Sequence, residues 1–335
     1  MKRILFLTLV AVLFASCEVE FSPNDSWREI PVVYCILDQD EDTTFVRLQR
    51  CFLAEGDQRA YFTNRDSLYY SQGAVKVQME EWKTDGSAPS KVYDFDYMEA
   101  GKDDGDFYSD NAPLYVCRTA GQLDSSCLYR LRVVRNATGE TIATGETRLV
   151  SGQQSLIHPN NAQSFQFSGN TKDCLIEWSL MEQARQYQPI VRFHYRDFVV
   201  HYDHTPVDTT ITYHHIDIPG NNVKSSMNES SLSTRMDMNY FLSTVRNNIK
   251  DVAVPKNIID TVDIFIVSCT EPLAAYLYAN HPAGGISQEP FEYTNIDGGL
   301  GVFAARRRHI SFKISTPNSS VSLYVRALKE LGVGF

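Results

Sequence analysis

The segments Leu175-Ile-Glu-Trp-Ser-Leu180 and Ile190-Val-Arg-Phe-His-Tyr-Arg-Asp-Phe-Val-Val200 decide the fold class of this chain. Both are rich in β-branched and aromatic residues, which favour strands. A third β-rich run, Asp208–Ile218, follows at hairpin distance. These three runs predict antiparallel β-structure in the second half of the chain.

The connection between the first two segments has a recognisable pattern. Trp178 lies on the first predicted strand, and Ala184 and Tyr187 form an Ala-x-x-Tyr sequence that opens the second. This arrangement resembles the start of a fibronectin type III domain. The resemblance implies a β-sandwich for the second domain.

The first half of the chain also reads as short strands separated by turn residues, without a convincing helical pattern. Seven strands and their turns are typical of an immunoglobulin-like β-sandwich. We therefore predict such a domain over residues 30–150, followed by a boundary in the polar stretch that starts at Ser151. The seven predicted strands are Pro31–Leu37, Thr44–Leu53, Val75–Trp82, Lys91–Tyr97, Leu114–Cys117, Leu128–Val134 and Thr141–Leu149.

Two helical patterns interrupt the second domain, residues 151–335. Apolar residues recur at helical spacing between Leu232 and Ile249, which predicts an amphipathic helix over about 229–250. Thr270-Glu-Pro provides a helix start, and Asn280-His-Pro ends that helix. The expected fold is mainly β, with two sandwich domains and a pair of α-helices inserted near residues 229–280. Strands are expected at Thr261–Cys269, His309–Ile314 and Ser320–Leu328, with a glycine-rich loop over residues 284–301.

The N-terminus predicts export and lipidation. A basic start, an apolar run of 11 residues from Ile4 to Phe14, and Ala15-Ser16 before Cys17 resemble a bacterial lipobox. This implies a signal peptide over residues 1–16, a lipidated Cys17 and a polar tether over residues 17–29. The expected location is the outer membrane of the cell envelope, on either face. The alternative is an ordinary signal peptide with an incidental cysteine.

Charge and cysteine content limit the partners. Without Lys2 and Arg3 the chain has 29 basic and 41 acidic residues, a formal charge of −12, which disfavours nucleic acid. Six cysteines remain after Cys17, an even number that permits disulfides in an exported protein. The candidate pairs are Cys117–Cys127 and Cys174–Cys269, and free thiols are the alternative.

A histidine-rich segment is a candidate metal site. In a hairpin that turns near Pro206, His201 would lie close to His214, with Asp203 adjacent, and this set could bind Zn²⁺. Exposed polar residues on an edge hairpin are the alternative. No cofactor is otherwise expected.

Motifs of enzymes are missing from the sequence: it contains no Gly-x-Ser-x-Gly, His-Glu-x-x-His or phosphate-binding glycine loop. The sequence therefore favours a non-enzymatic protein. Carboxylate pairs for glycoside hydrolysis stay open, because their spacing exists only in the fold.

Tyr293-Thr-Asn-Ile-Asp-Gly-Gly-Leu-Gly-Val-Phe303 is the most distinctive stretch of the mature chain. Its glycines permit positive φ and close backbone approach. One interpretation is a loop that contacts a partner, and the other is a structural turn that leads into a strand. The candidate contact residues are Tyr293, Asn295, Gly298, Gly299 and Gly301.

This stretch, the Val-Val-Tyr-x-x-Leu sequence that begins at Val32, and the Trp178–Tyr187 segment together resemble a family of Bacteroidota lipoproteins of unknown function. Genes of this family often lie beside those of TonB-dependent outer-membrane receptors. The resemblance implies a binding or accessory module that partners such a receptor, with an unknown ligand. A structural surface protein or adhesin subunit and, less favoured, a hydrolase are the alternatives.

Overall fold

The computed structural model describes most of the chain: residues 29–51, 64–101, 111–160, 162–201, 208–226, 228–249, 256–280, 293–308, 312–316, 326 and 328–329. The predicted signal peptide 1–16, Cys17 and residues 18–28 of the tether lie outside the described residues. None of the described helices has the length and apolar character needed to cross a membrane.

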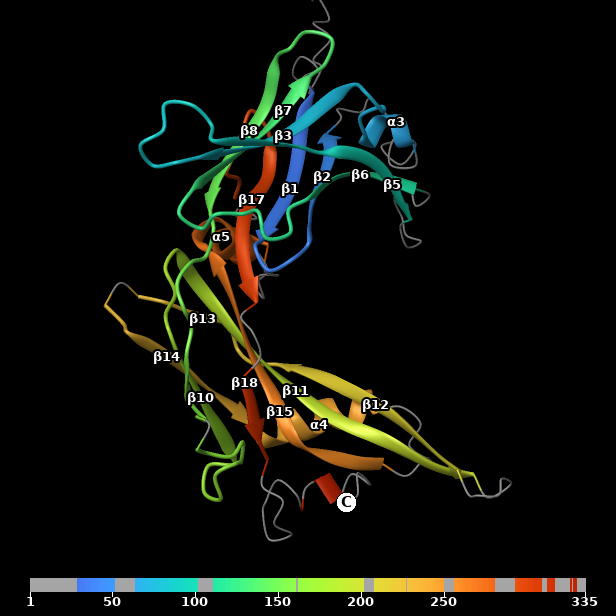
Figure 1. The fold of residues 1–335 in the computed structure, drawn as a ribbon, viewed down its shortest axis with the longest axis vertical. Helices are drawn as coiled ribbons and strands as arrows, with labels where there is room; N and C mark the ends of the chain where they lie inside the picture. The colour runs from blue at the N-terminus through green and yellow to red at the C-terminus, as the bar shows by residue number, and fades with distance from the viewer. Residues whose placement is uncertain are drawn as a thin grey trace, which may run out of the picture.

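The fold is mainly β, as the sequence predicts, and forms two lobes that Figure 1 shows one above the other. The N-terminal lobe contains β1 (Ile30–Asp38), β2 (Thr43–Cys51), α3 (Arg65–Leu68), β3 (Val75–Trp82), β4 (Lys91–Asp94), β5 (Asp96–Gly101), β6 (Asn111–Arg118), β7 (Leu128–Arg135), β8 (Thr141–Arg148), β16 (Ile296–Asp297) and β17 (Leu300–Arg308). The C-terminal lobe contains β9 (Leu156–His158), β10 (Asp173–Ser179), β11 (Ala184–His201), β12 (Asp208–Pro219), β13 (Val223–Lys224), β14 (Ser231–Asp237), α4 (Met238–Asn248), β15 (Lys256–Thr270), α5 (Glu271–Ala279) and β18 (Phe312–Ser315). The immunoglobulin-like and fibronectin-like topologies remain predictions.

The N-terminal lobe is built from two sheet layers around one core. One layer is the five-stranded sheet β16-β8-β7-β3-β4, and the other is the part of a ten-stranded sheet that contains β17, β1, β2, β6 and β5. Alternation places Tyr129, Leu131 and Val133 of β7 in the core, as expected for strands with one buried face. The predicted strand Lys91–Tyr97 is divided, because the chain changes sheets at buried Phe95.

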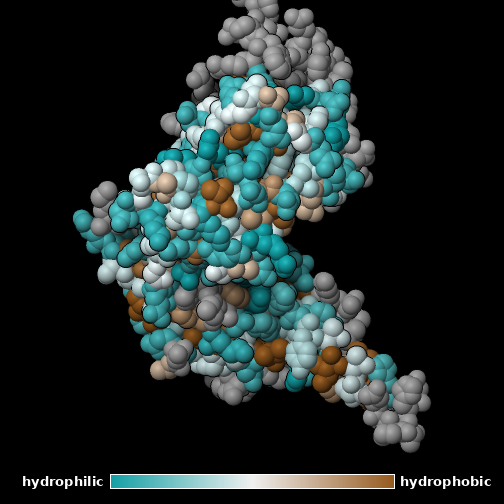
Figure 2. All heavy atoms as spheres, turned by 45° about the horizontal axis from the view of Figure 1, so that its top comes forward, coloured by the Kyte–Doolittle hydropathy of each residue, from teal (hydrophilic) through white to brown (hydrophobic). Residues whose placement is uncertain are grey.

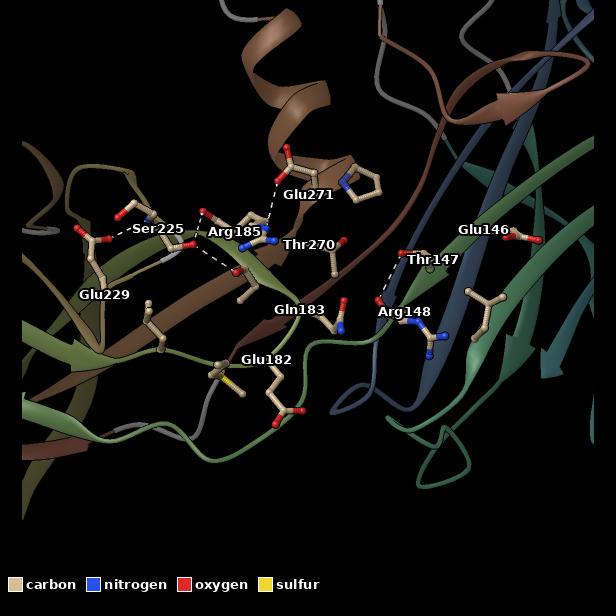
Figure 3. Close-up of a pocket in the computed structure, with 16 residues that line it drawn as sticks. Glu146, Thr147, Arg148, Glu182, Gln183, Arg185, Ser225, Glu229, Thr270 and Glu271 are labelled. Atoms are coloured by element: carbon tan, nitrogen blue, oxygen red, sulfur yellow. Dashed lines mark hydrogen bonds and ion pairs between the residues drawn. The ribbon is translucent and has the colours of Figure 1, made fainter. Parts of the chain in front are cut away.

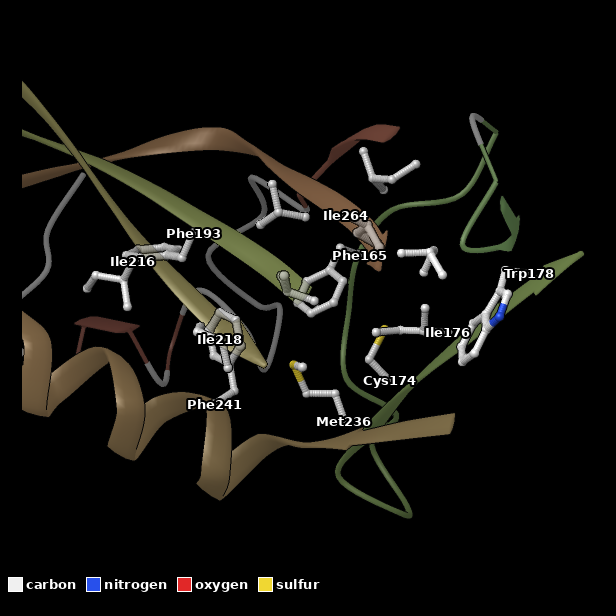
Figure 4. Close-up of a cluster of buried hydrophobic side chains, with 14 of the residues drawn as sticks. Phe165, Cys174, Ile176, Trp178, Phe193, Ile216, Ile218, Met236, Phe241 and Ile264 are labelled. Atoms are coloured by element: carbon white, nitrogen blue, oxygen red, sulfur yellow. The ribbon is translucent and has the colours of Figure 1, made fainter. Parts of the chain in front are cut away.

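The C-terminal lobe packs the remaining strands of the large sheet, β12, β11, β15 and β18, against the sheet β14-β10-β9 and helix α4. Figure 4 shows Trp178 at one end of the core, and Phe193 and Phe241 further along it. All three side chains are fully buried. Burial of each such side chain contributes about 2–3 kcal/mol, so this core stabilises the lobe without help from disulfides.

Two secondary-structure predictions in this lobe need correction, although the helix expected over about 229–250 is present as α4. Leu232 and Met236 lie on β14, and the helix begins only after Asp237, whose carboxylate accepts a hydrogen bond from the Tyr240 amide. A spacing of four residues fits one face of a strand as well as one face of a helix, so the sequence pattern was ambiguous. The expected strand Ser320–Leu328 also fails where it is described, because Arg326 and Leu328 are helical.

The chain passes from one core to the other between Leu149 and Val150, and it later returns. β17 pairs in parallel with β1 over seven residues and antiparallel with β15 over three. The sequence had suggested that residues 151–335 form a self-contained domain. They do not, because Ile296 and Phe303 lie in the N-terminal core. The expected loop over residues 284–301 also ends in strand structure at β16 and β17.

Glycines at the start of β17 allow this return. Gly301 has φ +110°, and a β-carbon there would lie 2.0 Å from the Val33 carbonyl oxygen. At Gly299 a β-carbon would lie 2.5 Å from the Pro31 carbonyl oxygen. Both contacts involve the backbone of β1, which cannot move aside as a flexible side chain can. Only glycine permits β17 to lie this close to β1.

We predict that Gly301→Ala lowers the free energy of unfolding by about 2–5 kcal/mol, because it adds both backbone strain and a clash with β1. Gly139→Ala is the matched control, since Gly139 has φ +72° but no atom near the added β-carbon. It should cost only about 1–2 kcal/mol. Urea denaturation measures both, and equal losses would contradict the close packing of β17.

Candidate binding site at the joint between the lobes

A cavity of about 600 Å³ lies where the two lobes meet, and Figure 3 shows its lining. The end of β8 contributes one wall, and the turn before β11 contributes the opposite wall. The start of α5 and the segment after β13 complete it. The polar side chains that line it are Glu146, Thr147, Arg148, Glu182, Gln183, Arg185, Ser225, Ser226, Glu229, Thr270 and Glu271.

The turn before β11 is held rigidly. Tyr187 accepts a hydrogen bond from the Met181 amide at 2.8 Å and donates one to the Met181 carbonyl at 3.3 Å. Glu182 exchanges two backbone hydrogen bonds with Ser151. This leaves Gln183 at φ +64°, a conformation that costs a non-glycine residue about 1–2 kcal/mol. The turn thereby directs the exposed Gln183 toward the cavity.

The carboxylates of the cavity already have partners. Glu271 pairs with Arg185 at 3.5 Å, Glu146 with Arg130 at 2.6 Å, and Glu229 accepts from the Ser226 amide at 2.9 Å. All three are exposed, so solvent weakens these contacts.

The fourth carboxylate of the cavity, Glu182, accepts a hydrogen bond from the Ser151 hydroxyl at 3.1 Å. Within the part of the chain that the structure describes, no carboxylate pairs with Arg148. A half-buried guanidinium that faces a polar cavity can bind a carboxylate or another planar acceptor through two parallel hydrogen bonds.

The same joint is fastened by charges outside the cavity. The acidic hairpin tip after β1 lies against two arginines at the end of β17: Arg306 contacts Asp38 at 3.3 Å, and Arg307 contacts Asp40 at 3.1 Å. Arg307 also donates to the Gly152 carbonyl. Burial raises the pKa of Asp38 above its usual range, although Arg306 opposes that shift. One partner of each ion pair, Arg306 and Asp40, is exposed to solvent, so these charges fix orientation more than they add stability.

The glycine-rich stretch Tyr293–Phe303 has a structural role. The Asn295 side chain donates to the Phe303 carbonyl at 2.7 Å and accepts from the Phe303 amide at 2.9 Å. Gly301 is buried beneath β1, and Tyr293 and Gly299 are partly buried, which leaves Gly298 as the exposed glycine. Tight packing against β1 and β8 accounts for this stretch without a partner. Contact of these five residues with a partner stays a prediction.

The predicted proximity of His201 and His214 was wrong. In the β11–β12 hairpin His201 lies opposite Asp208, whereas His214 lies opposite Tyr195, six positions further along β11. The hairpin turns between residues 201 and 208, closer to His201 than the sequence suggested. Asp203 lies outside the described residues. Among the residues that the structure describes, no group of three metal-binding side chains occurs.

His214 instead belongs to a buried ionic cluster. Its Nε2 lies 2.9 Å from Asp197, and Lys256 lies 2.7 Å from the other oxygen of the same carboxylate. The Lys256 side chain is 2% exposed and the Asp197 side chain 11%. Burial alone would raise the pKa of Asp197, but hydrogen bonds from Lys256 and His214 outweigh it and lower the pKa. The cluster links β11, β12 and β15.

The proposed disulfides are absent, because all six described cysteines are free. Cys117 ends β6 and Cys127 precedes β7, strands that belong to different sheets and do not form a hairpin. Cys174 lies in the core of the C-terminal lobe, whereas Cys269 packs beneath α5. Burial raises the pKa of Cys174 to about 12 and that of Cys269 to about 11, which keeps both as unreactive thiols.

The residues of the cavity had no signal in the sequence. They come from five separate segments, and each segment alone resembles an ordinary polar turn. Comparison with protein-family models and with curated proteins finds no match for the chain. The chemistry of the cavity therefore has to be interpreted from its own side chains.

We predict that Lys256→Met lowers the free energy of unfolding by about 3–5 kcal/mol, because it leaves the Asp197 carboxylate buried with only His214. The double variant Lys256→Met/Asp197→Leu should recover most of that loss. Urea denaturation at neutral pH tests both variants. A double variant that is even less stable than Lys256→Met would contradict a buried ion pair between Lys256 and Asp197.

The same cluster predicts a pH dependence. Because the pKa of Asp197 is lowered in the fold, its contribution is complete above the ordinary aspartate pKa of about 4 and is lost as the pH falls below it. Acid should therefore destabilise the wild type more than the double variant. Denaturation midpoints that fall equally with acid in both proteins would contradict this.

Thiol titration tests the cysteines. A chain that begins at Glu18, and so lacks Cys17, should show six reactive thiols when it is unfolded in denaturant. In the native state only Cys51 and Cys117, which are partly exposed, should react quickly. Four thiols in denaturant would instead indicate one disulfide.

Proposed function

We propose that this protein is a non-enzymatic lipoprotein of the outer membrane that acts as a binding or accessory module. In this proposal Cys17 carries the lipid, and the partner is a TonB-dependent receptor. The lipobox-like N-terminus supports the anchor, and the resemblance to receptor-linked Bacteroidota lipoproteins supports the partner.

The observation that carries the binding role is the cavity at the joint, because both lobes contribute to its polar lining. Arg148 comes from the N-terminal lobe and Gln183 from the C-terminal lobe, and Figure 3 shows both among the residues that line the cavity. A ligand that bridges them would bind only while the lobes keep their arrangement. The Arg148 guanidinium, which pairs with no carboxylate among the described residues, favours a polar ligand with a carboxylate or similar acceptor.

The geometry of the cavity gives the hydrolase alternative little support. Its four carboxylates, those of Glu146, Glu182, Glu229 and Glu271, are all exposed. A glycosidase requires one carboxyl group in an environment that raises its pKa. The cavity is therefore better suited to binding than to acid catalysis.

Affinity purification tests the proposal. Native protein, tagged at its C-terminus and solubilised with the envelope of its own host, should co-purify with an outer-membrane receptor. Cys17→Ala should release the protein from the membrane fraction. Recovery of the protein without any receptor would contradict the accessory role and favour a structural surface subunit.

A charge reversal tests whether the cavity contributes. Arg148→Glu should lower receptor recovery at least several-fold, whereas Arg118→Glu, an exposed arginine on β6 outside the cavity lining, should not. Equal recovery with both variants would place the contact elsewhere.

A further inference from the structure

Strand β12 is an unusually long free edge. It has 12 residues and ends the ten-stranded sheet, paired on one side with β11. The other edge strands in the described structure, β16, β4, β9, β5 and β14, have between two and seven residues. Short edges are one way in which proteins prevent unwanted strand pairing, and β12 does not use it.

The other protective devices are also missing from its centre. Thr209-Thr-Ile-Thr-Tyr-His-His-Ile216 contains no lysine, arginine, carboxylate, proline or glycine. Its twelve pairs with β11 run without a bulge. β-Branched and aromatic residues of this kind strongly favour further strand pairing.

This edge is accessible. Figure 1 shows the β11–β12 hairpin extending outward beyond the body of the C-terminal lobe, and Figure 2 shows hydrophobic side chains along the same projection. Ile211 is 41% exposed and Tyr213 is 66% exposed. Among the described residues, only β11 forms hydrogen bonds with the backbone of residues 210–215. The outward amides and carbonyls therefore remain available to another strand.

We propose that β12 pairs antiparallel with β12 of a second copy of this chain, which makes a two-fold symmetric dimer through one continuous sheet. A two-fold axis near Tyr213 places Tyr213 opposite itself and Ile211 opposite His215. Asp217 then faces Thr209, so no two carboxylates oppose each other. The formal charge of the mature chain is −12, but the centre of β12 carries no carboxylate that would repel a copy at close range.

Self-pairing also accounts for the form of the edge. A two-fold contact uses the same surface on both copies and closes on itself, so it produces a dimer and not a fibre. The hydrogen bond between His214 and Asp197 links β12 to β11 in addition to the backbone pairing of the two strands. A second copy satisfies the free hydrogen-bonding groups of both edges at once.

The mass in solution is the direct test. The mature chain from Glu18 onward, purified without its lipid, should have twice the mass of one chain by light scattering, and dilution should dissociate it. Ile211→Lys/Tyr213→Lys should be monomeric at every concentration, because Tyr213→Lys sets two ammonium groups opposite each other. Both side chains are exposed, so at dilutions where the wild type is also monomeric the two proteins should have nearly the same thermal unfolding midpoint.

Ile36→Lys/Phe45→Lys is the matched control. These side chains are 38% and 49% exposed on β1 and β2, and the variant has the same change of charge. It should remain a dimer. A wild-type monomer up to the solubility limit would overturn the proposal, and so would a dimer that survives Ile211→Lys/Tyr213→Lys.

A crosslink tests the register. Residues opposite each other in an antiparallel pair have β-carbons about 4.5–5.5 Å apart, which is close to disulfide range. Under mild oxidation Tyr213→Cys should form a disulfide between two copies through position 213. Thr171 is an exposed residue in a turn away from β12. If Thr171→Cys crosslinks as strongly as Tyr213→Cys, the specific pairing is contradicted.

Discussion

The pairing of β17 with β1 is the constraint on which the rest of the structure depends. β17 lies between β1 and β15 and so joins strands of both lobes in one sheet. Its two faces serve different neighbours: Phe303 and Ala305 enter the N-terminal core, whereas Val302 and Ala304 pack beneath α5. Thr270 adds a side-chain link, since its hydroxyl bonds to both the amide and the carbonyl of Ala305. The orientation of the lobes, and the cavity between them, follow from this strand.

The sequence predicted the local features well. Alternation identified β3 and β7, and Thr270-Glu-Pro marked the start of α5, because these signals depend on residues close together in the chain. It failed where distant segments decide the outcome. β17 pairs with β1, and the paired residues Asp38 and Arg306 are 268 positions apart in the chain. No local pattern specifies a parallel strand pair of that separation.

The candidate sites show the same difference between features set by local sequence and features set by distant segments. The glycines at the start of β17 were recognisable as positions of close approach, but only the fold shows that β1 is the neighbour. The metal site was predicted from the residue types of His201 and His214. Their actual separation depends on the register of the hairpin, which the sequence does not show. The cavity could not be predicted, because five segments that are unremarkable individually form it together.

These features fit one arrangement of a lipid-anchored protein. The described chain begins at Glu29, whose carboxylate pairs with Arg135 at 2.7 Å in the N-terminal lobe. A lipid on Cys17 would be at most about 40 Å from that point along an extended tether. The proposed anchor would thus hold the N-terminal lobe near the membrane, while the joint cavity and the edge of β12 lie further along the molecule.

Hydrogen exchange of the backbone amides tests the central role of β17 most directly. If β17 fastens the lobes, the amides of residues 302–308 should be as strongly protected as those of residues 33–37 on β1, and both groups should exchange in the same opening event. Rapid exchange in β17 while β1 and β2 stay protected would show that β17 frays independently. That result would contradict a joint held by this strand.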